Sequence, residues 1–189
     1  MICEAILTTR DRAGRAHVAP MGFREEDGLV RLAPFRPSTT LDNLQAVGTA
    51  VLNLTDDVRV FAGCLTGRRD WPTVPAERVP GVRLERTLAH RELEVTRVED
   101  DEVRPAVYCR ERHAVVHAPF RGFNRAQAAV IEAAILVSRL HLLPREKIER
   151  EIEYLTIAVE KTAGPREQEA WQWLMEAVAR HHAAPEAGA

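Results

Sequence analysis

The spacing of apolar residues changes at Pro119, and this change constrains the fold more than any other feature of the sequence. Before Pro119, apolar runs of strand length alternate with short turns that contain glycine or acidic residues. After it, apolar residues recur three and four positions apart, as on one face of a helix. We therefore expect an α+β protein with an antiparallel β domain over residues 1–118 and a helical C-terminal domain over residues 119–189.

Six segments before Pro119 have the length and composition of strands. We expect them at residues 3–9, 16–24, 29–34, 49–54, 81–98 and 103–118. The segment 81–98 alternates imperfectly, so we expect one long strand with a kink. Residues 71–80 contain Pro72, Pro75 and Pro80 and are typical of a loop.

Capping residues predict where the helices begin and end. Ser38, Thr39 and Thr40 can each cap a helix over residues 39–47, and Gly48 can end it. A short helix is expected at 58–65. In the C-terminal part, Asn124 can cap a first helix, and three helices are expected at about 125–141, 145–162 and 166–181.

The segment 36–43 joins a strand to a helix and has the composition of an anion site. A helix N-terminus carries unpaired N–H groups and a partial positive charge. Here it is crowded by one guanidinium, from Arg36, and by three hydroxyl groups, from Ser38, Thr39 and Thr40. Such an end can hold a phosphate. The alternative from these residues alone is a well-capped helix with a solvent-facing arginine.

The expected strand at 16–24 has an unusual middle. Pro20 has no N–H to donate to a ladder, and Gly22 has no side chain to pack. A central strand avoids both residues. The pattern therefore favours an edge, a bulge or a place where a ligand lies flat against the backbone.

Composition and charge exclude several function classes. The 189 residues carry a net charge of −2, which does not favour a non-specific nucleic-acid binder. No apolar run approaches the 18 residues of a membrane span, and Met1–Glu4 lacks the basic start of a secretory signal, so we expect a cytoplasmic protein. Cys3, Cys64 and Cys109 are far apart in the sequence and are expected to be reduced thiols. We expect no metal site.

The order of these features resembles a known family. A strand with Ala19-Pro20-Met21-Gly22, a further strand, Arg36-Pro37-Ser38-Thr39-Thr40 with Asn43, and an apolar strand ending in Asn53 are similar to an FMN-binding split barrel. Within that superfamily the chain resembles the DUF447 family. Its C-terminal segments 124–126, 139–144 and 160–165 are similar to the helical part of that family.

The resemblance implies a cofactor and a set of contacts. It places the FMN phosphate on Arg36, Ser38, Thr39 and Thr40, with Asn43 nearby, and the isoalloxazine ring along Ala19, Pro20, Met21 and Gly22. It also implies a homodimer with flavin at the interface. Asn53, Thr55 and Asp56 are then expected to contact the same flavin or the partner's.

Three functions remain open on this fold. The first is an FMN-dependent oxidoreductase with a nicotinamide donor, in which the flavin supplies the electron chemistry and no catalytic side chain is identified. The second is a flavin-binding module without turnover, which acts as a carrier, sensor or assembly partner. The third keeps the fold and binds a deazaflavin. A haem would need an axial ligand, and no histidine is obviously placed to provide one.

Overall fold

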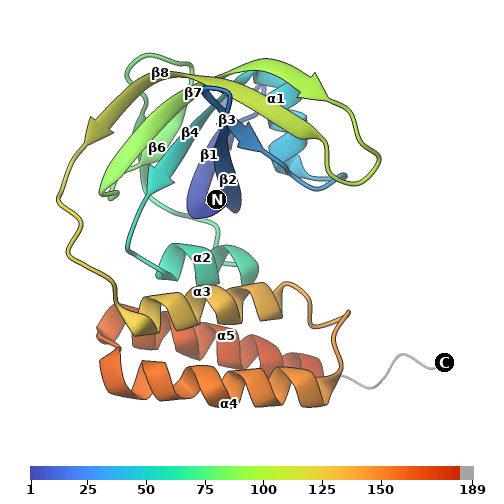
Figure 1. The fold of residues 1–189 in the computed structure, drawn as a ribbon, viewed down its shortest axis with the longest axis vertical. Coiled ribbons are helices and arrows are strands. Elements are labelled where there is room, and N and C mark those ends of the chain that lie inside the picture. Colours follow the sequence, from blue (N-terminus) through green and yellow to red (C-terminus); the bar gives the residue numbers. More distant parts are fainter. Residues whose placement is uncertain (184–189) are drawn as a thin grey trace. The chain divides into compact units, whose positions relative to one another are not determined.

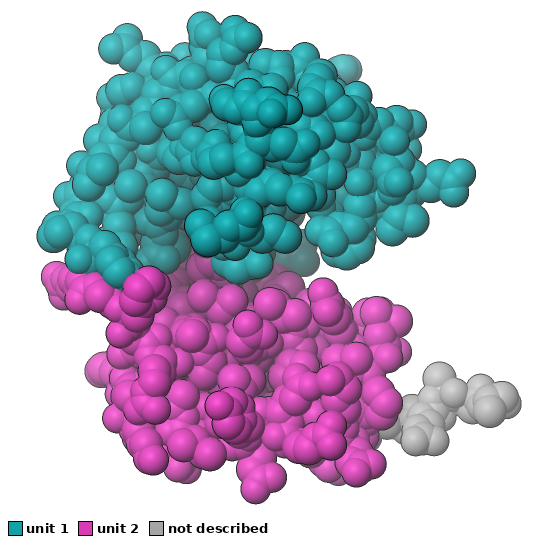
Figure 2. All heavy atoms as spheres, in the orientation of Figure 1, with its two compact units in different colours: residues 1–56, 69–120 teal, residues 57–68, 121–189 magenta. Residues whose placement is uncertain are grey.

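The computed structural model describes residues 1–183. They form two compact units, coloured separately in Figure 2. The first contains residues 1–56 and 69–120, and the second contains residues 57–68 and 121–183 of the described chain. Residues 57–68 lie inside the predicted β domain, but they pack with the C-terminal helices. The prediction that residues 1–118 and 119–189 fold as separate domains therefore remains a prediction.

The first unit is a closed barrel of six antiparallel strands, in the order β1-β2-β3-β8-β7-β4 (Figure 1). Its strands are β1 (Cys3–Arg10), β2 (Ala16–Glu26), β3 (Leu29–Leu32), β4 (Thr49–Leu54), β7 (Ala89–Glu99) and β8 (Ala106–Val116). Helix α1 (Thr39–Val47) lies between β3 and β4 in the chain. The predicted antiparallel barrel is confirmed.

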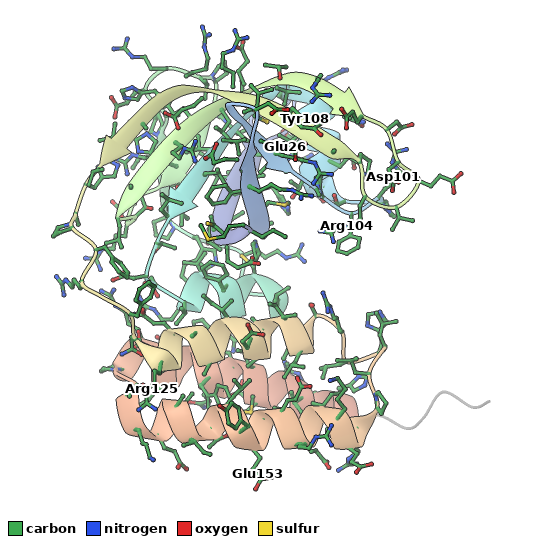
Figure 3. The ribbon with its side chains drawn as sticks, in the orientation of Figure 1. Glu26, Asp101, Arg104, Tyr108, Arg125 and Glu153 are labelled. Carbon is green, nitrogen blue, oxygen red and sulfur yellow. The ribbon has the colours of Figure 1, made fainter. Side chains whose placement is uncertain are left out.

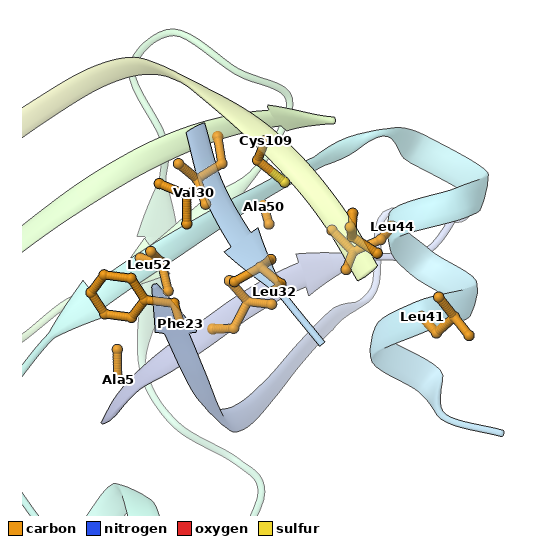
Figure 4. Packing of buried hydrophobic residues seen from close by; sticks show 12 residues of the cluster. Ala5, Phe23, Val30, Leu32, Leu41, Leu44, Ala50, Leu52 and Cys109 are labelled. Atoms are coloured by element: carbon orange, nitrogen blue, oxygen red, sulfur yellow. The ribbon is translucent and has the colours of Figure 1, made fainter. Parts of the chain in front are cut away.

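Alternate residues of each strand fill the barrel (Figure 4). Leu7 on β1 lies opposite Leu52 on β4, and both side chains belong to the buried cluster. Leu41 and Leu44 of α1 join the same cluster, which explains why α1 presents an apolar face. Burial also raises the pKa of the Cys109 thiol to about 12, so this cysteine is an apolar core residue.

A short hairpin covers part of the outer face of the barrel, where a loop and a single long strand were predicted. The segment contains β5 (Thr73–Pro75) and β6 (Val82–Leu84), and β7 begins only at Ala89. The prediction of one strand over 81–98 was wrong because residues 85–88 turn. The Thr87 hydroxyl donates to the carbonyls of Leu54 and Ala89, which fixes this turn against β4.

Four helices form the second unit: α2 (Arg59–Leu65), α3 (Arg125–Val137), α4 (Arg145–Thr162) and α5 (Pro165–Ala183). The three predicted C-terminal helices are confirmed. Asn124 caps α3 as predicted, because its side-chain oxygen accepts from the N–H groups of Ala126 and Gln127. The core of this unit joins α2, α3 and α5 through Val58, Ala62, Val130, Ala133, Ala134, Ala170 and Leu174. No helix within residues 1–183 is long and apolar enough to cross a membrane.

Candidate cofactor site

Part of β2 has a strand partner on only one side. β1 pairs with β2 along residues 16–23, whereas β3 pairs only with residues 23–26. Within the described chain, residues 16–22 therefore present one open edge, and Ala19, Pro20, Met21 and Gly22 lie on it. Pro20 is tolerated at an edge because it has no N–H to lose. At Ala19, Met21 and Gly22 no described strand pairs with this edge, so a ligand can approach the backbone there.

The two faces of this segment differ. Met21 packs against the barrel core. Gly22 lies on the opposite face, where an added Cβ would come within 3.1 Å of Ile2 Cγ2 and 3.5 Å of Glu4 Oε1. Because Gly22 has no side chain, other groups can come close to its backbone. In this structure the side chains of Ile2 and Glu4 do so.

Helix α1 packs against the β1–β2 hairpin, whose second strand carries this edge. Ser38 is its N-cap, and the hydroxyl oxygen of Ser38 accepts from the N–H of Leu41 at 3.2 Å. Thr39 is exposed and Thr40 is buried. The side-chain amide of Asn43 donates to the Thr9 hydroxyl at 3.0 Å, and Thr9 pairs with His17 of β2. Asn43 therefore fixes α1 against the β1–β2 hairpin.

The loop before α1 is held by the turn between β7 and β8. The Arg36 N–H donates to the Val103 carbonyl at 2.9 Å, and its guanidinium donates to Asp100 at 2.8 Å. The Asp100 side chain is 78% exposed, so this ion pair lies in water and contributes little to stability. Arg36 is therefore available to exchange Asp100 for another anion.

A second guanidinium lies at the same loop and was missed from the sequence. Arg104 donates to the Ala33 carbonyl, with its Nη2 at 3.1 Å, and lies over the Phe35 ring at 4.4 Å from the centroid. Figure 3 labels Arg104 and Asp101 at this turn. Asp101 accepts from the backbone N–H groups of Arg104 and Val103, which lower the pKa of its carboxyl group. Arg104 lies 68 positions after Arg36, so no local sequence pattern could show that the two residues meet.

Asn53 is placed differently from the expected flavin contacts. It is completely buried beneath the β5–β6 hairpin. Its Oδ1 accepts from the Leu84 N–H at 2.7 Å, and its Nδ2 donates to the Ile6 carbonyl at 3.1 Å. These bonds satisfy a buried amide, as the apolar surroundings require. The Asn53 amide is thus engaged within the barrel wall and does not belong to the candidate cofactor site.

Thr55 and Asp56 lie at the other end of the barrel from Arg36. They follow Leu54, which pairs with Ala89 at the start of β7, whereas Arg36 contacts the turn after the end of β7. The eleven residues of β7 span roughly 30 Å of strand. Asn43 thus joins α1, which follows the loop 36–40, to the hairpin that carries the open edge, whereas Thr55 and Asp56 lie at the other end of the barrel.

Comparison with known families decides where this chain belongs. Residues 3–118 match the model described as Protein of unknown function (DUF447) N-terminal domain, and residues 124–176 match Protein of unknown function (DUF447). The chain belongs to the DUF447 family. No curated protein matches this DUF447 chain.

Solved structures share the fold of this DUF447 protein. It is similar to the FMN-bound protein MM1853 from Methanosarcina mazei, with a TM-score of 0.81, 20% identity, and coverage of 93% of this chain and 94% of that one. The 2-nitrobenzoate 2-nitroreductase NbaA of Pseudomonas fluorescens has a TM-score of 0.52 at 18% identity, covering 60% and 64% of the two chains. The styrene monooxygenase flavin reductase of Pseudomonas putida S12 has a TM-score of 0.51 at 14% identity, covering 60% and 77%. These similarities confirm the split-barrel fold.

Proposed function

We propose that this DUF447 protein binds FMN along the open edge of β2 and at the start of α1, and acts as a flavin-dependent oxidoreductase. The observation that carries the proposal is a strand edge that no strand of the described chain pairs, on the same hairpin against which α1 packs, with a guanidinium in the loop before α1. The similarly folded MM1853, which is described as FMN-bound, supports the choice of ligand.

The start of α1 suits the phosphate. The first-turn N–H groups and the helix dipole favour an anion at this position. Ser38, Thr39 and Thr40 would surround it with hydroxyl groups, and Arg36 would add a charge-assisted contact. Arg104 lies at the same loop and would add positive charge near the phosphate.

The edge of β2 suits the ring. Planar aromatic ligands need close approach to backbone N–H and C=O groups, and Ala19, Pro20, Met21 and Gly22 offer an edge that no strand covers. When bound, the flavin supplies the hydride chemistry, and the protein residues bind and orient it. We propose a reduced nicotinamide as the donor and assign no catalytic side chain.

Spectroscopy of the purified protein tests this function. We expect the protein to carry FMN or to take it up, with the flavin absorbance bands and a matching mass for the released cofactor. We also expect anaerobic bleaching of the bound flavin by NADH or NADPH. Bleaching by dithionite alone would support a carrier, sensor or assembly module, and a deazaflavin mass would change the cofactor. A protein that binds no flavin would overturn the proposal.

We further propose that the protein is a homodimer with an isologous interface. Thr55 and Asp56 lie at the other end of the barrel from Arg36, so they are too far away to contact a flavin held by Arg36 of the same chain. In a two-fold dimer they would contact the flavin of the other chain. Light scattering of the flavin-loaded protein at micromolar concentration is expected to give the mass of two chains. A monomer with flavin still bound would contradict this proposal.

Replacing Arg36 by alanine is expected to weaken FMN binding by about 1.5–3 kcal/mol, the size of a hydrogen bond to a charged group. This corresponds to a loss of roughly 10- to 150-fold in affinity. Riboflavin has no phosphate, so its affinity should stay the same in both proteins. Fluorescence titration of both flavins measures the difference. Arg145→Ala, which removes an arginine from an exposed ion pair in the helical unit, is the matched control. Equal FMN affinity in wild type and Arg36→Ala would remove Arg36 from the site.

Replacing Asp100 by asparagine is expected to strengthen FMN binding. Asp100 is the anion that Arg36 contacts in this structure, so a phosphate has to displace it. Asparagine removes the competing charge. We expect the free energy of FMN binding to become more favourable by about 0.3–1 kcal/mol, the size of an exposed ion pair. The gain should shrink as salt is added, because salt screens exposed charges. Weaker FMN binding in Asp100→Asn would instead mean that Asp100 holds Arg36 in its binding position.

A further inference from the structure

Three titratable side chains form a chain across the outer wall of the barrel, and none belongs to the proposed flavin site. Glu92 and His90 lie on β7, and both are 0% exposed. His90 Nε2 lies 3.2 Å from Glu92 Oε1, and His90 Nδ1 lies 2.8 Å from His117 Nε2. His117 follows β8 and is exposed. A buried carboxylate is thus connected through a buried imidazole to an imidazole in contact with solvent.

Glu92 is held in its charged form. Burial alone would raise the pKa of this carboxyl group, but backbone N–H groups of Glu77, Arg78 and Val79 donate to it at 2.6, 2.7 and 2.8 Å. Together with His90 they outweigh burial and lower the pKa of Glu92 below its usual value. The three donors come from the segment between β5 and β6, so the charge also anchors that segment to the barrel.

The charge on Glu92 determines where the protons of the two imidazoles lie. An ionised carboxylate only accepts hydrogen bonds, so Nε2 of His90 must carry a proton. Neutral His90 then accepts at Nδ1, and Nε2 of His117 must donate. Neutral His117 therefore keeps its lone pair on Nδ1, which has no hydrogen-bond partner among the described residues.

An added proton enters at Nδ1 of His117. The positive charge either stays on His117 or moves inward, when the proton on Nε2 of His117 passes to Nδ1 of His90. In both arrangements Nδ1 of His117 is protonated and Glu92 balances the charge. A second added proton would place two N–H groups face to face across 2.8 Å, so the pair of histidines binds one proton at a time.

Three neighbouring groups affect this site. Burial and the charge of Arg83, on β6, lower the pKa of His117, as does His90 whenever it already carries the extra proton, whereas the charge of Glu77 raises it. His113, on β8, has its ring centroid 6.2 Å from that of His90, and its Nε2 lies 3.2 Å from Glu77 Oε2. Together these effects lower the pKa of His117, so its imidazole is neutral near pH 7 and can act as a base.

We propose that Glu92, His90 and His117 form a second functional site, at which Nδ1 of His117 accepts one proton from a hydroxyl, thiol or amine group of a bound molecule and later returns it. His117 is the acid–base residue, and His90 and Glu92 position it and compensate its charge. Pro20, Ile6, Asn53 and His90 are successive neighbours across β2, β1, β4 and β7. The site thus lies three strand spacings, roughly 14 Å, from the open edge of β2.

Imidazole nitrogen NMR of the full-length protein tests the proton positions. Above its titration, His117 in the wild type is expected to carry its proton on Nε2, and His90 and His117 together should take up one proton as the pH falls. His90→Gln should lower the proton affinity of His117 by about tenfold, because the charge can no longer move toward Glu92. This variant retains the Glu92 bonds to residues 77–79, so the segment stays anchored. His113→Gln is the control and should leave the His117 tautomer unchanged.

Hydrolysis of 4-nitrophenyl acetate tests the lone pair on Nδ1 of His117, because a neutral imidazole attacks the ester carbonyl carbon, 4-nitrophenolate leaves, and water then hydrolyses the acetylated imidazole. We expect the rate at pH 7.5 to fall by about tenfold in His117→Gln and to stay at the wild-type value in His141→Gln, which removes an exposed histidine of the helical unit. Neutral His117 protonated on Nδ1, uptake of two protons, or equal rates in wild type and His117→Gln would each overturn the proposal. Flavin binding does not enter either measurement.

Discussion

Replacing Glu92 by alanine is expected to lower the free energy of unfolding by about 3–5 kcal/mol, the cost of removing one partner from a buried charged network. Glu92 is completely buried, and its two oxygens satisfy three backbone N–H groups and His90. Alanine leaves all four donors without a partner, inside a wall that water does not reach. We expect no other single substitution in the barrel unit to cost more.

Glu94→Ala is the matched control for this prediction. Glu94 lies two residues along the same strand, but it is exposed, and its ion pair with Arg112 spans 3.5 Å. Its loss should cost less than about 1 kcal/mol. Urea denaturation of both variants measures the difference. If Glu92→Ala unfolds at the same urea concentration as Glu94→Ala, then the segment 77–79 is not held by the carboxylate.

Replacing Leu174 by alanine is expected to destabilise the helical unit by about 2–5 kcal/mol. Leu174 on α5 is 0% exposed and lies in the cluster that joins α5 to α3 and to Val58 and Ala62 of the α2 segment. Alanine removes the branched end of the side chain and leaves a cavity between three helices. In the sequence α2 lies between two strands of the first unit, β4 and β5, but its side chains pack in the helical unit. This substitution therefore also tests with which unit α2 folds.

Tyr154→Ala on α4 is the control, because Tyr154 is 76% exposed. This substitution should lower the free energy of unfolding by less than about 0.5 kcal/mol. Hydrogen exchange distinguishes the units. In Leu174→Ala, amides of α2 should lose protection together with those of α3 and α5, while amides of β1 and β4 keep theirs. If the amides of α5 lose protection and those of α2 do not, then residues 57–68 fold with the barrel, as the predicted domain division at residue 118 requires.

Much of the fold could be predicted from local sequence signals because local physics determines those features. Ser38 and Asn124 cap helices where the sequence places capping residues, and Gly48 ends α1 with a φ of 77°, which favours glycine. Five of the six predicted barrel strands lie close to their expected positions. The sixth, 81–98, was wrong because the turn at 85–88 depends on Thr87 and Leu88 bonding to Leu54, more than 30 positions away.

The candidate site could be predicted only in part, for the same reason. The loop at Arg36 and the strand at Pro20 have local signatures, and the structure places Arg36 before α1 and Pro20 on an edge, one of the three alternatives for that strand. Arg104 and Asp100 reach that loop from the β7–β8 turn, which no local pattern connects to it. Asn53 was expected to contact the flavin because the resemblance to dimeric split barrels implies it. Its partners are Ile6 and Leu84, and only the three-dimensional pairing of strands identifies them.

The open edge of β2 has a consequence for handling and storage of the protein. An uncovered strand edge is a template on which a strand from another molecule can add, and this is a common start of aggregation. Residues 16–22 offer such an edge, and Pro20 interrupts it by removing one donor. The FMN proposed for this edge would also limit such addition, so protein without flavin is expected to lose soluble material faster than flavin-loaded protein.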